Sequence, residues 1–162
     1  LHTGAQEEIM RVFPHKYGES VLLAVSGGAD SLVMGELFLR DNGVEGPSVR
    51  LAVAHCNFHL RGAESDGDAA FVQEWASGHG LKCHIADFDT HAFASERGVS
   101  VEMAARELRY RWFDELCSEY GYSGVCVAHN ANDNAETLVL NSSAVIGTYS
   151  IFTSKYCPAE SV

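Results

Sequence analysis

Short uninterrupted apolar runs alternate along this chain with longer segments in which apolar residues recur at helical spacing. The run Val21-Leu22-Leu23-Ala24-Val25 is typical of a strand that is covered on both faces. Similar strands are expected at residues 49–54, 82–88 and 125–128, and helices at residues 3–14, 29–42, from 65 onward, 101–120 and 132–140. Strands that alternate with helices predict an α/β fold with an open, mostly parallel sheet and helices on both faces.

The helical pattern ends after residue 140, where Ser, Thr and Tyr become frequent. A length of 162 residues suits one domain. We therefore expect one domain over residues 1–140 and a poorly ordered tail over residues 141–162.

Composition narrows the classes of protein that need to be considered. Eleven Lys and Arg against 22 Asp and Glu give a net charge of −11, which excludes a generally basic nucleic-acid coat. The longest aliphatic run has five residues and is too short to span a bilayer. The five cysteines include no C-x-x-C pair, so reduced thiols in a cytoplasmic protein are expected.

The strongest local signal for chemistry is the word Ser26-Gly27-Gly28-Ala29-Asp30-Ser31, between a predicted strand and a predicted helix. Glycines let an anionic group approach the backbone, and the helix N-terminus offers free N–H groups. The word lacks the Lys of the G-x-x-x-x-G-K-[ST] loop. Asp30 suggests a Mg²⁺ ion beside the anion. The alternative is a tight turn in which Asp30 and Ser31 only cap the helix.

Two further polar clusters follow predicted strands. His55-Cys56-Asn57 ends the second strand, and Ala128-His129 begins a polar segment that runs to Thr137. The carboxyl ends of parallel strands are where open α/β sheets bind ligands. The three clusters are therefore expected at one edge of the sheet.

The predicted helix at residues 101–120 places two arginines beside its buried stripe. On a helical wheel Val101, Ala105, Leu108, Trp112 and Leu116 share an arc of roughly 80°. Glu102, Arg106, Arg109 and Phe113 fall on the adjoining arc of roughly 60°, with Arg111 pointing away. Glu102 and Arg106 are expected to pair at i, i+4.

Together these words resemble a known family. The word at residues 26–31 looks like the PP-loop of the PP-loop ATPases, which cleave ATP between its α and β phosphates. His55-Cys-Asn57 with Leu60-Arg61, then Ser100-x-Glu102-x-x-Ala-Arg106-x-x-Arg109-Tyr110, then Ala128-His129-x-x-x-Asp133-x-x-Glu136-Thr137, complete an ordered set. Over residues 18–140 this set is similar to the tRNA(Ile)-lysidine synthetases, which join lysine to the wobble cytidine of an isoleucine tRNA.

The resemblance implies a Rossmann-like fold of the adenine nucleotide α-hydrolase type and a ligase that uses ATP, Mg²⁺, free lysine and tRNA(Ile). It also implies further tRNA-binding domains beyond this chain. The family often has His at the position of Phe58, and paired aspartates where this chain has Asn132-Asp133. Whether the chain forms a homodimer stays open.

Roles carry over to matching positions only as the resemblance implies them. The ATP-binding set is Ser26, Gly27, Gly28, Ala29, Asp30, Ser31, His55 and Asn57. The catalytic set is Asp30, Arg109, His129 and Asp133, of which Asp30 and Asp133 would hold the metal. The substrate-binding set is Arg61, Glu102, Arg106 and Glu136.

Several alternatives stay open beside this interpretation. Another PP-loop enzyme, a tRNA thiolase or an amidating ligase, is the nearest, although a thiolase would usually need a cysteine pair that this sequence does not space suitably. A non-catalytic ATP-binding module is the other. Cys56 is expected to be a buried filler rather than a reactive thiol, and the spacing of His and Cys residues argues against zinc.

Overall fold

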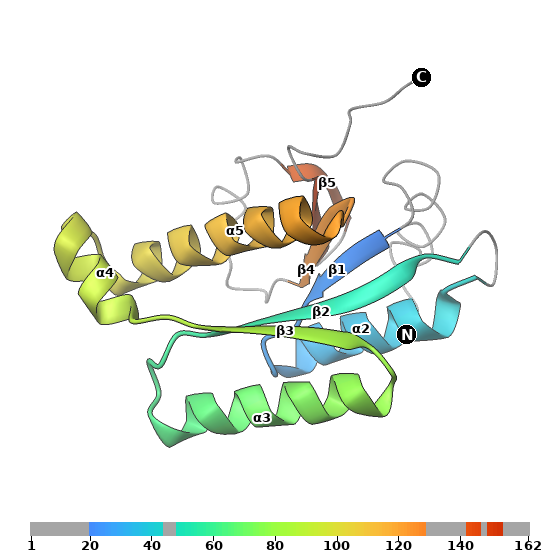
Figure 1. Ribbon diagram of the computed structural model, residues 1–162, viewed down its shortest axis with the longest axis horizontal. Coiled ribbons are helices and arrows are strands. Elements are labelled where there is room, and N and C mark those ends of the chain that lie inside the picture. Colours follow the sequence, from blue (N-terminus) through green and yellow to red (C-terminus); the bar gives the residue numbers. More distant parts are fainter. Residues whose placement is uncertain (1–19, 44–47, 129–141, 147–148, 154–162) are drawn as a thin grey trace.

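In a computed structural model, the described part of the chain folds into a six-stranded sheet with helices on both faces (Figure 1). The structure describes residues 20–43, 48–128, 142–146 and 149–153. Its elements are β1 (Ser20–Ala24), α2 (Ala29–Asp41), β2 (Arg50–Asn57), α3 (Ala63–Gly78), β3 (Lys82–Asp87), α4 (Thr90–Arg97), α5 (Val101–Tyr120), β4 (Gly124–Ala128), β5 (Ser142–Ile146) and β6 (Tyr149–Thr153).

The order of the strands is β3-β2-β1-β4-β6-β5. The first four are parallel, and β6 and β5 continue the sheet in antiparallel pairing. The prediction of an open, mostly parallel α/β sheet is therefore confirmed. From β1 the chain builds β2 and β3 on one side and then crosses to add β4 on the other. This reversal between β1 and β4 is the topological switch point, where open sheets form a ligand-binding crevice.

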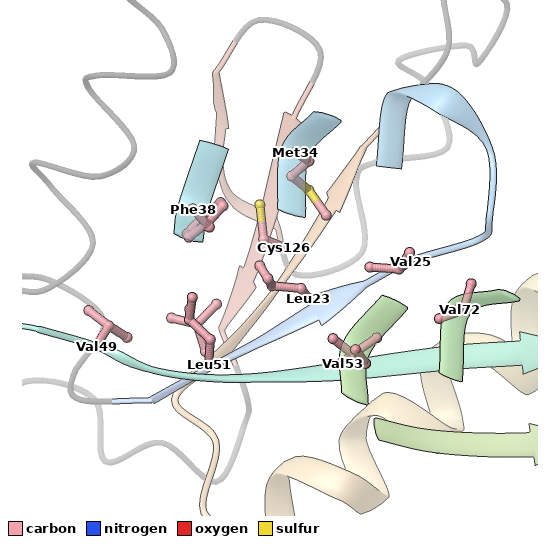
Figure 2. Close-up of a cluster of buried hydrophobic side chains, with 11 residues drawn as sticks. Leu23, Val25, Met34, Phe38, Val49, Leu51, Val53, Val72 and Cys126 are labelled. Carbon is pink, nitrogen blue, oxygen red and sulfur yellow. The ribbon is translucent and has the colours of Figure 1, made fainter. Parts of the chain in front are cut away.

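Alternating side chains on each strand supply one apolar core on either face of the sheet. Val21 and Leu23 of β1 belong to one cluster with Met34 and Phe38 of α2, and Figure 2 shows Leu23 on the side of the sheet that carries these two residues. Leu22 points to the other face, which α5 covers (Figure 1). The period of two in a strand explains the division, since neighbouring residues must face opposite sides.

The buried face of α5 is rotated slightly from the stripe that the wheel predicts. Its buried residues are Ala104, Ala105, Phe113, Leu116 and Cys117. Val101, Leu108 and Trp112 are only half-buried. The helix therefore turns the arc of Phe113 and Arg109 toward the sheet, because the side chains of β1, β2 and β4 fill the space below that arc.

Caps explain where the helices begin and end. Ser100 Oγ accepts the N–H of Met103 at the start of α5, and Gly121 ends that helix with a φ of +75°. The helix expected from residue 65 onward begins at Ala63 instead, and Ser65 Oγ accepts the N–H of Arg61 within its first turn. The sequence interpretation missed α4, which is short and polar.

Two strands lie in the stretch expected to be a poorly ordered tail. β6 pairs with β4, so the sheet continues across the proposed boundary at residue 140. The helices expected at residues 3–14 and 132–140 lie outside the described residues. Among the helices that are described, none has the length and apolar character needed to span a membrane.

Candidate functional site

A cavity of about 380 Å³ opens at the carboxyl ends of β1, β2 and β4. The start of α2 and the middle of α5 close its sides. Its lining residues are Ala24, Val25, Ser26, Gly28, Ala29, Asp30, Ser31, Ala54, Cys56, Phe58, Arg109, Phe113, Val127 and Ala128. The expectation that the polar words meet at one edge of the sheet therefore holds for the two words that are fully described.

The loop between β1 and α2 is held in shape by its own serines. The N–H of Ser26 donates to Ser31 Oγ at 3.1 Å, and Ser31 Oγ donates to the carbonyl oxygen of Gly28 at 3.0 Å. Ser31 is buried, so its hydroxyl is used within the loop rather than directed at a ligand. Gly28 is the N-cap of α2 and has no side chain with which to cap it. The N–H groups of the first turn of α2 are therefore the donors that this loop offers to an anion.

Gly27 is the conformationally demanding position of this loop. Its φ is +91°, in the region that L side chains rarely adopt. A Cβ atom there would lie 3.3 Å from Cβ of Asp68, which approaches from α3. Arg61 forms an ion pair with this Asp68 and another with Glu64 at 3.2 Å. The structure thus places Arg61 behind the loop, outside the cavity lining.

Asp30 and Arg109 line the same cavity from two different helices. Asp30 is in the first turn of α2 and is exposed to solvent. Arg109 comes from the middle of α5, and its Cζ lies 5.3 Å from the ring centroid of Phe58. One carboxylate and one guanidinium therefore border the space beside the free N–H groups of α2.

The other two charged residues that the sequence singled out on α5 do not reach the cavity lining. Glu102 is exposed, and Arg106 lies over the ring of Tyr110 at 5.7 Å. Within the described part of the chain they form no ion pair with each other, so the predicted i, i+4 pair is wrong. Glu107 of this helix instead pairs with Arg97 at the end of α4 and with Arg111.

His55 and Asn57 are buried on the face of β2 opposite to Ala54 and Cys56. The Nδ1–H of His55 donates to the carbonyl oxygen of Val25 at 2.8 Å, which joins the ends of β1 and β2. Asn57 Nδ2 donates to Asp66 Oδ1 at 2.9 Å. Neither residue lines the cavity, and the observed contacts of both are structural.

Cys56 lines the cavity but has the properties of a neutral thiol. Burial raises the pKa of Cys56 to about 12, and the nearby charge of Arg109 and a hydrogen bond from its guanidinium oppose that shift. A thiol with this pKa is protonated at pH 7 and is a poor nucleophile. Its environment supports the expected role of a filler.

Three candidate residues, His129, Asp133 and Glu136, lie outside the described residues. The structure therefore tests only whether Asp30 and Arg109 converge, and not whether Asp133 joins them. Among the described residues there is no group of three or more His, Cys, Asp or Glu side chains that could hold a metal. Asp30 alone still fits Mg²⁺, which is commonly bound through one or two carboxylates and the phosphates of a substrate.

Sequence reasoning missed most of the apolar wall of the cavity, namely Val25, Ala54, Phe58, Phe113 and Val127. The signal that could have found part of it is the alternation on β2, which puts residues 54 and 56 on one side, with residue 58 next in that series just past the end of the strand. That signal shows which residues share a side, but only the position of α5 decides that this side borders the cavity.

An α/β sheet with a glycine loop leading into a helix at its switch point defines a nucleotide-binding class of fold. The sequence model of the PP-loop domain family matches residues 1–155, and the chain belongs to this family. The resemblance seen in the ordered motifs is thereby confirmed.

Curated relatives make the comparison more specific. The chain is 54% identical over 121 residues to a tRNA(Ile)-lysidine synthase of Porphyromonas gingivalis, covering 75% of this chain and 25% of that protein. It is 45% identical over 124 residues to the tRNA(Ile)-lysidine synthase of Chlorobaculum tepidum, covering 76% of this chain and 37% of that protein. The chain thus spans only 25% and 37% of the length of these two relatives.

A solved structure of the U34-tRNA thiolase NcsA from Methanococcus maripaludis is similar in fold. Its TM-score is 0.59 at 21% sequence identity, with 85% of this chain and 50% of that chain covered. At this identity the similarity supports the fold and leaves the reaction open.

Proposed function

We propose that this chain is the ATP-binding domain of a ligase that forms lysidine in tRNA(Ile). In this reaction ATP adenylates the carbonyl oxygen of the wobble cytidine and pyrophosphate leaves; the amine of free lysine then displaces AMP. The observation that carries the proposal is the shared cavity, in which a bare-backbone loop, Asp30 and Arg109 meet at the switch point of the sheet. The names of the relatives support the choice of tRNA(Ile) and lysine.

Each part of the cavity has a physical task in this proposal. The first-turn N–H groups of α2 bind phosphate oxygens, and the positive end of the helix dipole favours that negative charge. Arg109 stabilises the charge that develops on the phosphates during transfer. The apolar wall formed by Ala54, Phe113 and Val127 provides a surface for the base.

Mg²⁺ would be held by Asp30 and, by resemblance, Asp133. When bound, it neutralises phosphate charge and aligns the reacting oxygens. Without a cation, Asp30 would repel an incoming polyphosphate.

The reaction is tested in a chimaera in which the 121 aligned residues of this chain replace those of the P. gingivalis relative. Incubated with tRNA(Ile), lysine and ATP, the chimaera should release AMP and pyrophosphate and form lysidine. Release of ADP would contradict the proposal, and incorporation of sulfur into tRNA would favour the thiolase. Binding of ATP with no pyrophosphate exchange would favour the non-catalytic module.

Variants of the chimaera assign the reaction to the cavity. Asp30→Asn and Arg109→Ala should each lower kcat by about a hundredfold, since each removes one fixed charge at the transferring phosphate. Asp41→Asn at the far end of α2 and Arg111→Ala on α5 are matched controls, because neither residue lines the cavity. Equal losses in the controls would contradict the assignment.

A further inference from the structure

Arg109 is the one positively charged residue among the described residues that line the cavity. It forms no ion pair within the described part of the chain. Two other arginines have a different environment, since Arg97 at the end of α4 and Arg111 of α5 both pair with Glu107, at 3.2 and 2.9 Å. A carboxylate partner would cancel much of the charge of Arg109 and occupy its donors.

The neighbour of the Arg109 guanidinium is a neutral aromatic ring rather than a carboxylate. The guanidinium of Arg109 lies 5.3 Å from the ring centroid of Phe58, within the range of a cation–π interaction. Cys56, which lies two residues earlier near the end of β2, lines the same cavity as Arg109, and burial keeps its thiol neutral by raising its pKa. Neither Phe58 nor Cys56 carries a charge, so neither of them neutralises the guanidinium.

Phe58 is itself fixed from several directions. Its ring stacks on Phe88, with centroids 5.6 Å apart, and Phe88 meets Trp112 of α5 edge to face at 6.1 Å. Its carbonyl oxygen accepts the hydroxyl of buried Thr90 at 2.8 Å.

The residues on either side of Phe58 are anchored to two further elements. The side chain of Asn57 is hydrogen-bonded to Asp66 of α3, and the side chain of His59 is hydrogen-bonded to Asp87 of β3. The ring therefore has little freedom to move away from Arg109.

We propose that Phe58 is a positioning residue that directs Arg109 toward the phosphates of ATP without neutralising its charge. This inference rests on the proposed function, because it assumes that the cavity binds ATP. Its physical basis is that a ring face attracts a cation by its quadrupole and uses few of the guanidinium N–H donors.

The first test measures the affinity of the 162-residue chain for ATP–Mg²⁺ and for adenosine. Phe58→Leu should weaken ATP binding about tenfold, as expected from the loss of one desolvated cation–π contact. It should leave adenosine binding unchanged, because adenosine carries no phosphate. Phe58→Tyr keeps the ring face and should retain wild-type affinity for ATP.

The matched control is Phe93→Leu. Phe93 carries Arg97 and Arg111 in similar geometry, at 5.0 and 5.6 Å, but does not line the cavity. This variant should bind ATP normally. If Phe58→Leu weakened ATP and adenosine binding equally, the proposal would be overturned, because the ring would then act on the nucleoside. Unchanged ATP binding in Phe58→Leu would also overturn it.

A double-mutant cycle separates positioning from general damage to the fold. In an Arg109→Ala background, Phe58→Leu should cause no further loss of ATP affinity, since the residue acts through Arg109. A further loss of about tenfold in that background would contradict the proposal.

A measurement that does not depend on ATP separates this inference from the proposed function. The Nε–H signal of Arg109 in a ¹⁵N-labelled chain, assigned with Arg109→Lys, should shift when Phe58→Leu removes the ring current, and should return in Phe58→Tyr. An unchanged signal in Phe58→Leu overturns the positioning role. A chain that shows the shift but binds no ATP contradicts the proposed function alone.

Discussion

At the scale of single residues, the loop after β1 depends on Gly27. A positive φ and the nearby Asp68 both argue against a side chain at this position. The loop is needed in this shape because it leads the chain from the end of β1 directly into the first turn of α2. The N–H groups of that turn then face the cavity.

Replacement of Gly27 by Ala should therefore impair both stability and binding. We expect the free energy of unfolding to fall by about 1–2 kcal/mol, the cost of a left-handed conformation for an L residue. ATP affinity should fall as well, because the loop relaxes away from Asp68. Denaturant unfolding and calorimetric titration would measure the two effects.

Gly62→Ala is the matched control for this prediction. Gly62 also has a positive φ, +58°, but a Cβ atom there would meet nothing within 4 Å. It should lose similar stability and keep its affinity for ATP. Equal loss of affinity in both variants would show that backbone strain alone, and not the shape of this loop, controls binding.

At the scale of elements, α2 and α3 pack against each other on the face of the sheet opposite to α5 (Figure 1). Trp75 of α3 lies against Gly35 of α2, and its Nε1–H donates to Glu36 at 2.9 Å. The ring of His79 packs against Trp75 at 5.0 Å. The indole is therefore held closely against the backbone of α2.

Two helix glycines should respond oppositely to substitution by Ala. At Gly35 a Cβ atom would lie 2.5 Å from Cη2 of Trp75, so we expect a loss of about 1–3 kcal/mol from overpacking. At Gly67 in α3 the space is open, so the better helix propensity of Ala should add about 0.5–1 kcal/mol. Thermal or denaturant unfolding of the two variants compares them directly. A stabilised Gly35→Ala would show that Trp75 moves aside at little cost.

At the scale of the whole molecule, a buried polar cluster joins β3 to the segment between α5 and β4. His84 Nε2 and the hydroxyl of Tyr122 lie 2.7 Å apart, and the ring of Tyr120 lies 4.5 Å from the ring of His84. Burial and the charge of Lys82 lower the pKa of His84, against the opposing effect of Glu119. This cluster ties the edge strand to the rest of the sheet.

The cluster makes stability depend on pH with a definite sign. The unfolded chain binds a proton at His84 more readily than the folded chain, so the stabilising effect is present above the ordinary pKa of about 6.5 and is lost as the pH falls through the lowered value. His84→Gln should therefore lose less unfolding free energy than the wild type between about pH 7 and pH 5. Denaturant unfolding at each pH measures the difference. His91→Gln, at an exposed position on α4, is the control; the same pH dependence in both variants would exclude His84 as the source.

The four parallel strands, most of the described helices and the glycine loop follow from local patterns in the amino-acid sequence, whereas β5 and β6 do not. An uninterrupted apolar run predicts a buried strand, and Ser100 marks the start of α5 as its N-cap. Glycine is the residue that suits the positive φ at position 27. The word at residues 26–31 therefore indicates, without any long-range information, at which end of the sheet the cavity lies.

The side chains that border the cavity follow instead from tertiary packing. Packing places Cys56 and Phe58 on the cavity wall, turns His55 and Asn57 to the opposite face of β2, and uses Arg61 to hold Asp68. The reason is physical: a strand always offers two faces, and the packing of α5 against β1, β2 and β4 selects the one that meets Arg109. Which face of the strand borders the cavity depends on contacts between segments that are distant in the chain, such as the contact between Phe58 and Arg109. A local sequence pattern does not contain this information.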